Sequence, residues 1–288
     1  RGFDAESASV ALQAAVDEVD AQMSIWKADS DLMRLNRTPV GETVPVPVAL
    51  EAVLRLGIAV GSTSGGAFDM GVGDVGLAWG FGPSEAMPDS IRAAMSVRRV
   101  PAHEALDVTD GEVTKRAPVT LDLNGIAKGF GVDRLTETLA QLGVADALVG
   151  IDGEMRAMGT RSDGEAWTVA VEAPDPGRRA PHSILSLSDC AVATSGDYRH
   201  FVEVRGRRLS HTIDPLRGAP LLESPASVTV VAPSCAAADA WATALMVLGP
   251  QEGSAFARKV GIDALFLLRG EDAKVGTQRV GRTFEQTT

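Results

Sequence analysis

The sequence predicts an α+β fold formed by one domain, and three observations support this prediction. Segments with the helical spacing of apolar residues lie on both sides of a long stretch, residues 168–232, in which strand patterns dominate. No composition break, low-complexity linker or short repeat divides the chain. Its 288 residues, 45% of them hydrophobic, are enough to bury a sizeable core. We therefore expect residues 1–288 to fold as a single unit.

The predicted elements follow from local patterns. Apolar residues recur at helical spacing in residues 5–26 and again in residues 47–62. Five glycines within residues 71–82 predict a backbone held in close turns, which suits close approach to a ligand. Arg205-Gly206 predicts a hairpin turn in the β-rich stretch. The other predicted elements are strands at residues 105–108, 112–115, 119–123 and 147–151, helices at 126–142, 235–248 and 251–260, and a terminal strand at 264–268.

Charge and composition exclude several classes of protein. Acidic residues outnumber basic ones 38 to 27, which gives a formal net charge of −11. This sign disfavours a DNA, RNA or anionic-membrane partner, because affinity for these partners depends on neutralising phosphates. No apolar run approaches the roughly 20 residues that span a bilayer. We therefore expect a chain that does not span a membrane.

Three short patterns lack the context that would give them a function. Residues 71–76 match G-x-G-x-x-G, but they follow a glycine cluster and not a buried strand, so a dinucleotide-binding turn is not indicated. Residues 24–27 match S-x-x-K without the S-D-N and K-T-G partners of penicillin-binding enzymes. The two cysteines and four histidines fall into no zinc-ligand spacing.

Two segments in the first half combine charge with glycine. In residues 66–69 (Gly-Ala-Phe-Asp), an acid follows an aromatic residue, which suits either a ligand site or a strand edge with a capping Asp. Residues 121–129 place a strand end directly before a helix. Free N–H groups and the helix dipole would favour an anionic ligand there, with Lys128 adding positive charge. The alternative is a capped helix with a solvated Lys128.

Two segments in the second half gather hydroxyl and carboxyl groups. Residues 193–198 and 210–215 bring together small hydroxyl residues, a histidine and two acids, which is unusual in a β-rich stretch; the alternatives are a simple turn and a surface or core histidine. Asp239 and Thr243 are i and i+4 on one predicted helix, so their oxygens share a face that could bind a hard cation. A hydrogen bond between Asp239 and Thr243 is the alternative.

Taken in order, these segments resemble the ApbE family of flavin transferases, the FAD:protein FMN transferases. Each block is weak alone, but six blocks in the family's order cover almost the whole chain. The matching segments are residues 23–26 with 30–36, 66–69 with 79–82, 121–123 with 125–129, 193–198, 210–211 with 214–215 and Gly218, and 238–240 with Thr243.

The resemblance implies a single T-fold-like unit of mixed and antiparallel sheets with packed helices. It also implies an activity: FAD and Mg²⁺ bind, FMN is transferred to a Ser or Thr hydroxyl of an acceptor flavoprotein, and AMP is released. The implied metal ligands are Asp239, Thr243 and a main-chain oxygen near Gly125, completed by oxygens of FAD. Mg²⁺ suits this set because it prefers oxygen ligands and commonly binds one carboxylate plus ligand phosphates.

The same resemblance assigns roles around the metal. His211 would orient or deprotonate the acceptor hydroxyl, because imidazole transfers protons near neutral pH. Asp239 would be essential for catalysis as the metal carboxylate. Trp26 would contact the isoalloxazine ring, with core packing as its alternative. The residues implied to line the FAD site are Trp26, Ala67, Phe68, Asp69, Asp122, Lys128 and Ile213.

Some features depart from the family pattern, and some questions stay open. Met70-Gly71 stands where Pro-Thr is frequent, and residues 151–154 (Ile-Asp-Gly-Glu) stand where a Gly-Gly pair is usual. The family's opening Met-Gly-Thr strand is missing, which suggests N-terminal trimming. The same site would also suit a hydrolase that splits FAD into FMN and AMP, or a protein that stores FAD. The resemblance suggests an acceptor that is a membrane-associated redox subunit facing the periplasm; a cytoplasmic flavoprotein reductase is the alternative.

Overall fold

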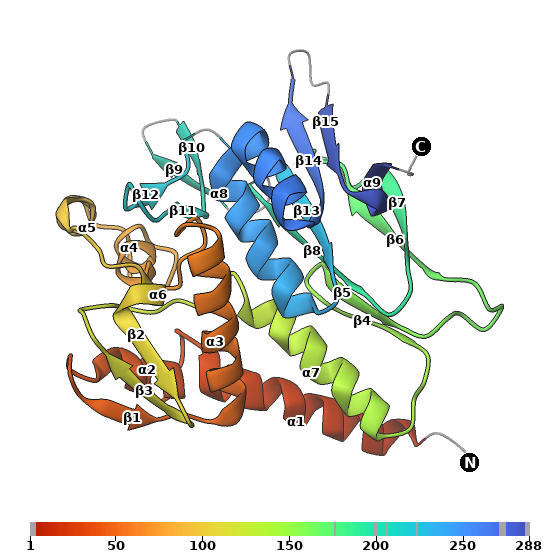
Figure 1. Cartoon of the computed structure of the whole chain (residues 1–288), viewed down its shortest axis with the longest axis horizontal. Coiled ribbons are helices and arrows are strands. Elements are labelled where there is room, and N and C mark those ends of the chain that lie inside the picture. The colour runs from red at the N-terminus through yellow and green to blue at the C-terminus, as the bar shows by residue number, and fades with distance from the viewer. Residues whose placement is uncertain are drawn as a thin grey trace.

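A six-stranded antiparallel sheet forms the centre of the protein in a computed structural model, which describes residues 4–175, 177–197, 201–204, 207–222, 224–270 and 275–285 (Figure 1). The strand order is β15-β14-β13-β8-β5-β4. Neighbouring strands in this order pair antiparallel throughout. The strands are β4 (Ala147–Ile151), β5 (Glu154–Met158), β8 (Ala191–Gly196), β13 (Ser227–Ala232), β14 (Asp263–Arg269) and β15 (Val275–Val280).

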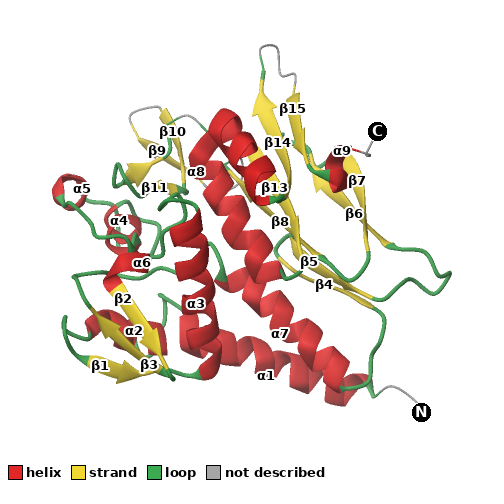
Figure 2. Ribbon diagram, viewed as in Figure 1, coloured by secondary structure: helices red, strands yellow, loops and turns green. Residues whose placement is uncertain are grey.

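Successive side chains of each strand point to opposite faces of the sheet, and apolar side chains lie on both faces. On β14, Ala264 and Phe266 join the cluster under α8 (Cys235–Val260), whereas Leu265 and Leu267 join the cluster on the opposite face. The second face is covered by the hairpin of β6 (Trp167–Glu172) and β7 (Pro181–Leu187) together with α9 (Arg282–Glu285). Helix α7 (Ala127–Gln141) lies beside α8 and packs on β4 (Figure 2).

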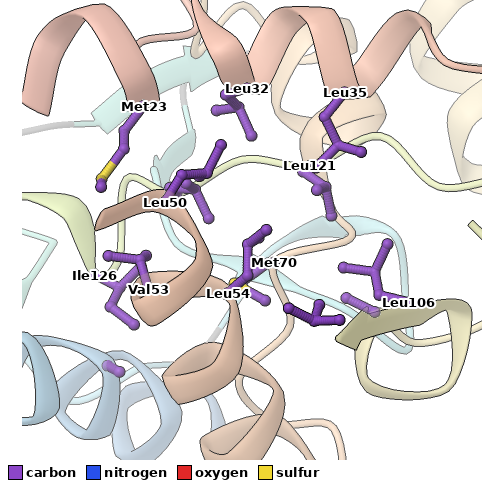
Figure 3. Close-up of a cluster of buried hydrophobic side chains, with 14 of the residues drawn as sticks. Met23, Leu32, Leu35, Leu50, Val53, Leu54, Met70, Leu106, Leu121 and Ile126 are labelled. Atoms are coloured by element: carbon purple, nitrogen blue, oxygen red, sulfur yellow. The ribbon is translucent and has the colours of Figure 1, made fainter. Parts of the chain in front are cut away.

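The second large core lies on the side of α8 that faces away from the sheet. Helices α1 (Ala5–Met23), α2 (Asp31–Arg37) and α3 (Val48–Thr63) contribute a third of its buried side chains, including Met23, Leu32, Leu35, Leu50, Val53 and Leu54 (Figure 3). Ala236, Ala240 and Ala244 of α8 join this cluster, while Ala238 and Ala242 join the cluster at the sheet. Small side chains on both faces therefore allow α8 to lie between two layers.

Shorter elements surround these layers. A three-stranded sheet of order β1-β3-β2 packs beside α3. Its strands are β1 (Thr43–Pro45), β2 (Leu106–Thr109) and β3 (Glu112–Lys115), and the other short elements are α4 (Gly73–Ala78), α5 (Pro88–Ser96), α6 (Ala102–Ala105), β9 (Phe201–Val204), β10 (Arg207–Ser210), β11 (Ile213–Asp214) and β12 (Ala219–Pro220). Within the described ranges, no helix is long and apolar enough to cross a membrane.

The α+β prediction is confirmed, and several predicted elements need correction. The helices predicted at residues 47–62 and 126–142 correspond to α3 and α7, and β3 and β4 have the predicted bounds. The helix predicted at 5–26 ends at Met23, because Ser24 has an extended backbone. The strand at 264–268 is not terminal, since β15 and α9 follow it. The hairpin turn predicted at Arg205-Gly206 lies outside the described residues, although β9 and β10 on either side of it pair antiparallel.

The range labelled α8 consists of the two predicted late helices, separated by a break. Gly249 has a φ of 73° and a ψ of 177°, which are not helical values, and Pro250 follows it inside α8. Proline lacks the N–H that a helix interior needs, so the chain restarts its helix there. The prediction of two helices, at residues 235–248 and 251–260, is therefore confirmed, and the break lies between them.

The strand predicted at residues 119–123 does not form. This segment is extended, but it makes only one isolated parallel bridge, between Thr120 and Val72. The side chain of Asn36 supplies the missing partner: its Oδ1 accepts from Leu121 N–H at 2.7 Å and its Nδ2 donates to Leu121 O at 2.9 Å. A side-chain amide thus satisfies the backbone groups that a neighbouring strand would otherwise bond.

We expect Asn36→Ala to lower the free energy of unfolding by at least about 2 kcal/mol, because both backbone groups of the buried Leu121 lose their partner. Urea unfolding followed by circular dichroism measures this change. Gln13→Ala, which removes an exposed hydrogen bond on α1, is the control and should change stability by less than about 0.5 kcal/mol. Equal stability of the two variants would contradict the role of Asn36.

Candidate active site

A single cavity of about 960 Å³ brings together every residue that the sequence assigned to FAD, metal or catalysis. This volume lies near the upper end of the range for small-molecule and cofactor sites. The walls come from segments far apart in the chain, including the loops after α1 and α3, the β4–β5 turn and the first half of α8. The eleven predicted residues in the cavity wall are Trp26, Ala67, Phe68, Asp69, Asp122, Gly125, Lys128, His211, Ile213, Asp239 and Thr243.

Three of these residues form an oxygen-rich corner at α8. Asp239 and Thr243 are one turn apart on α8, and Gly125 lies against Thr243. A Cβ atom at Gly125 would lie 3.0 Å from Thr243 Oγ1 and 3.3 Å from the Phe68 ring, so only glycine fits there without displacement. Thr243 Oγ1 also lies 3.2 Å from Ser195 Oγ, within hydrogen-bond distance. The alternative of a simple Asp239–Thr243 hydrogen bond does not occur, since both side chains have other partners.

The donor set of this corner suits Mg²⁺. Carboxylate, hydroxyl and main-chain oxygens are hard ligands, and the close fit at Gly125 brings its backbone next to the Thr243 hydroxyl. Among the described residues, no group of three or more His, Cys, Asp and Glu side chains could hold a metal by itself. Asp239 would therefore hold a cation together with oxygens of other kinds, such as the Thr243 hydroxyl and main-chain oxygens.

Asp239 is a buried carboxylate of the cavity wall with a strongly raised pKa. Burial and the neighbouring Glu154 raise its pKa to about 7, against the opposing effects of Lys128 and of the Gly129 N–H, which donates to Asp239 Oδ2 at 3.1 Å. Its side chain is only 4% exposed. A buried carboxylate in this electrostatic environment gains strongly from a bound cation, which favours its ionised form.

Lys128 is partly exposed to solvent, with 44% of its side chain accessible, and its ammonium group is paired with carboxylates. Its Nζ lies 2.7 Å from Oε1 of Glu154 and 4.0 Å from Asp152. Glu154 is 3% exposed, and its second carboxylate oxygen is buried without a hydrogen-bond partner. Burial raises the pKa of Glu154 although Lys128 acts to lower it. The charge that the sequence predicted for an anionic ligand is therefore already balanced by a carboxylate.

Most of the N–H groups at the start of α7, which the sequence predicted to be free for an anionic ligand, already donate hydrogen bonds within the protein. The amides of Ile126 and Ala127 donate to the carbonyl oxygen of Leu123, and the amide of Gly129 donates to Asp239. This corrects the expectation of an open helix N-terminus. An anionic ligand near α7 must gain most of its stabilisation from other groups.

The two remaining carboxylates among the predicted residues shape the wall. Asp69 Oδ1 accepts hydrogen bonds from Gly71 N–H at 2.8 Å and Ala102 N–H at 2.9 Å, so Asp69 holds the start of α6 as well as lining the cavity. Asp122 accepts from the backbone and the side chain of Asn124. Burial raises the pKa of both Asp69 and Asp122.

The aromatic and histidine positions lie at the more open parts of the cavity. Trp26 is 64% exposed, which excludes its alternative role in the core. His211 is exposed beside the buried Thr212, and Ile213 packs with Val75 and Trp79. Tyr198, part of the third predicted segment, lies outside the described residues.

The glycine-rich segment serves packing as well as the cavity. A Cβ atom at Gly73 would lie 2.8 Å from Thr120 O, so glycine is required where α4 begins against the extended segment. Gly76 and Gly80 line the cavity itself. The predicted close approach is thus partly to the protein's own backbone.

Several cavity residues escaped the sequence analysis. Glu154 and Asp152 stand in a segment that differs from the family pattern, which was the only available signal. Glu172 and Arg179 come from the β6–β7 hairpin, whose approach to the cavity depends on long-range packing. With them, acidic side chains in the wall outnumber lysine and arginine by six to two: Asp69, Asp122, Asp152, Glu154, Glu172 and Asp239 against Lys128 and Arg179.

The fold and the cavity define an α+β protein with a large acidic site for a ligand of cofactor size. The sequence pattern of the ApbE family matches residues 3–266, and the chain belongs to this family. The FAD:protein FMN transferase of Vibrio cholerae is 36% identical over 273 residues, covering 93% of this chain and 81% of that protein. The FAD:protein FMN transferase of Haemophilus influenzae is 36% identical over 277 residues, covering 92% and 79%.

Solved structures of the family agree with this assignment. The flavinyl transferase ApbE of Pseudomonas stutzeri, in its apo form, superposes with a TM-score of 0.85 at 37% identity, covering 97% of this chain and 87% of that chain. The flavin transferase ApbE of Vibrio cholerae superposes with a TM-score of 0.86 at 32% identity, covering 99% and 91%. The predicted family and fold are therefore confirmed.

We expect Lys128→Met to destabilise the protein by about 1–3 kcal/mol, because it leaves the buried Glu154 carboxylate unpaired, while partial exposure of Lys128 limits the loss. The loss should grow from pH 5 to pH 8, since a carboxyl group with a raised pKa is tolerated when protonated and loses stability as it ionises. Chemical denaturation at each pH measures it.

Adding Glu154→Gln to Lys128→Met should restore most of the stability and remove the pH dependence caused by the substitution. Lys27→Met, which breaks an exposed pair with Asp20, is the matched control and should cost less than about 1 kcal/mol. A pH-independent loss in the Lys128 variant would refute this account.

Proposed function

We propose that the protein transfers the FMN portion of FAD to a Ser or Thr hydroxyl of an acceptor flavoprotein, with Mg²⁺, and releases AMP. The observation that carries this proposal is the convergence of all eleven assigned residues, from five separate segments of the chain, on one cavity of about 960 Å³. Relatives that are 36% identical are FAD:protein FMN transferases, which supports the same substrate here.

The metal would be held by Asp239, Thr243 and the main chain at Gly125, together with phosphate oxygens of FAD. When bound, Mg²⁺ offsets the charge of the pyrophosphate and of the departing AMP. The acidity of the cavity makes this contribution necessary, because six carboxylates surround a ligand that is itself an anion and Lys128 is paired with Glu154. Arg179, at 82% side-chain exposure, is too solvated to provide the whole compensation.

The protein's own residues position the reacting groups. Trp26, exposed on the cavity wall, presents a ring face for the isoalloxazine. His211, also exposed at the cavity, is suited to orient the incoming hydroxyl and accept its proton. Transfer breaks the pyrophosphate bond of FAD and forms a phosphoester bond, so alignment of these groups accounts for most of the catalysis we propose.

The acceptor and its compartment are part of the proposal. A redox subunit that carries an accessible Ser or Thr on the periplasmic side of the membrane is the acceptor we favour, from the family resemblance. A cytoplasmic flavoprotein reductase is the alternative. The exposed position of His211 supports a protein acceptor, because a large substrate can approach this side chain from solvent.

A direct assay tests the activity. The protein is incubated with FAD, Mg²⁺ and a purified redox-subunit domain, and we expect AMP together with a flavin-fluorescent acceptor band on a denaturing gel. AMP without the band would assign FAD hydrolysis instead. Tight FAD binding without AMP would assign storage, and a failure of FAD to bind or to raise the melting temperature would exclude the family function.

We expect Asp239→Asn to reduce Mg²⁺-dependent AMP release by at least about 100-fold, because the corner would lose its only carboxylate ligand. The rate is measured at several Mg²⁺ concentrations. Asp263→Asn is the control: this carboxylate accepts from Thr283 at the start of α9, outside the cavity, and its loss should leave the rate unchanged. Full activity of Asp239→Asn would overturn the metal assignment.

A further inference from the structure

The first turns of α7 and α8 touch through their backbones. A Cβ atom at Gly129 would lie 2.3 Å from Cys235 O and 2.8 Å from Ala236 N, distances that no side chain can occupy. Figure 1 shows the two helices meeting near their starts, from which α8 extends toward the top of the view and α7 toward the lower right. The contact lies where both helices begin, so the unpaired N–H groups of both first turns lie close together.

Each helix supplies a carboxylate that accepts N–H groups of the other. Asp239 of α8 accepts from Gly129 N–H of α7 at 3.1 Å, and Asp133 of α7 accepts from Cys235 and Ala236 N–H of α8, each at 2.9 Å. The two carboxylates occupy equivalent places, because Gly129 and Asp133 are i and i+4 on α7 while Cys235 and Asp239 are i and i+4 on α8. Each helix thus fixes the other.

The arrangement accounts for the first N–H groups of α8. The Asp133 carboxylate accepts hydrogen bonds from the N–H groups of Cys235 and Ala236. The Ser234 side chain accepts from Ala237 N–H at 3.3 Å, and the Ser234 carbonyl oxygen accepts from Ala238 N–H. Asp133 is itself held by Arg156 Nη1 at 2.6 Å and is only 5% exposed. Its side chain therefore fixes where α8 begins relative to α7.

The position of Asp239 depends on where α8 begins relative to α7. Asp239 lies one helical turn after Cys235, and Gly125 lies just before α7, so the relation of the two helices sets the distance between these metal-binding positions. Asp133 does not line the cavity, and the hydrogen bonds that it accepts from Cys235 and Ala236 connect it to the start of α8. We propose that Asp133 is a positioning residue that holds Asp239 and Thr243 in the geometry needed to bind the divalent cation; this inference rests on the metal site of the proposed function.

The test measures metal affinity directly. Mn²⁺, which replaces Mg²⁺ as a paramagnetic probe, is titrated into the intact protein that has been saturated with FAD in the absence of acceptor, and free Mn²⁺ is counted by electron paramagnetic resonance. We expect Asp133→Asn to raise the Kd for Mn²⁺ by about 10-fold or more, the size of loss seen when residues that orient metal ligands are changed. The substitution keeps the side-chain volume but replaces one accepting oxygen by an NH₂ group that faces N–H donors.

A second variant and a control separate positioning from general destabilisation. Gly129→Ala places a methyl group against Cys235 O and should weaken Mn²⁺ binding in the same direction, so the test holds even if Asp133→Asn does not fold. Asp263→Asn removes a comparable capping carboxylate at α9 and should lower the melting temperature while leaving the Kd unchanged. Circular dichroism verifies the folding of each variant.

The outcomes distinguish this inference from the proposed function. If the unsubstituted protein binds no Mn²⁺, or if Asp239→Asn binds it equally well, the metal assignment fails and the inference fails with it. If the unsubstituted protein binds Mn²⁺ through Asp239 but folded Asp133→Asn or Gly129→Ala retains the same Kd, only the positioning role is overturned. The same loss in Asp263→Asn would also overturn it, since a remote cap would then have equal influence.

Discussion

The contact between the first turns of α7 and α8 is the constraint on which the cavity depends. Gly129 allows the two backbones to touch, and the paired carboxylates Asp133 and Asp239 satisfy N–H groups that would otherwise be buried without partners. One of these carboxylates also belongs to the cavity wall. The hydrogen bonds that cap the two helices therefore also hold a residue of the cavity wall in place.

The composition of α8 makes this contact possible. Its first half is rich in alanine, with Ala238 and Ala242 against the sheet and Ala240 and Ala244 against the core around α3. A helix with larger side chains on both faces would push the layers apart and widen the cavity. Burial of Asp239 in this helix is the main reason why its pKa is raised, and the neighbouring Glu154 carboxylate adds to the effect.

Charge is arranged locally, against the overall acidity of the chain. The net charge is −11, and carboxylates also dominate the cavity wall. Because Glu154 pairs with Lys128, the cavity holds little unbalanced positive charge for a pyrophosphate. In the proposed function, a cation that binds together with FAD would supply the missing positive charge, and binding of FAD and of the metal would then be mutually dependent.

The sequence by itself determined the elements and the residue types of the site. Periodicity located α3, α7 and β4, and the order of short motifs identified the eleven cavity residues, because side-chain chemistry and local spacing are properties of the chain. Tertiary structure decided the rest. Asn36 replaced a strand partner for Leu121, Glu154 neutralised Lys128, and Asp133 fixed the start of α8, each through a contact between residues more than 20 positions apart. Such contacts leave no periodic signal in the sequence, since they depend on how separate elements pack and on which buried polar groups need partners.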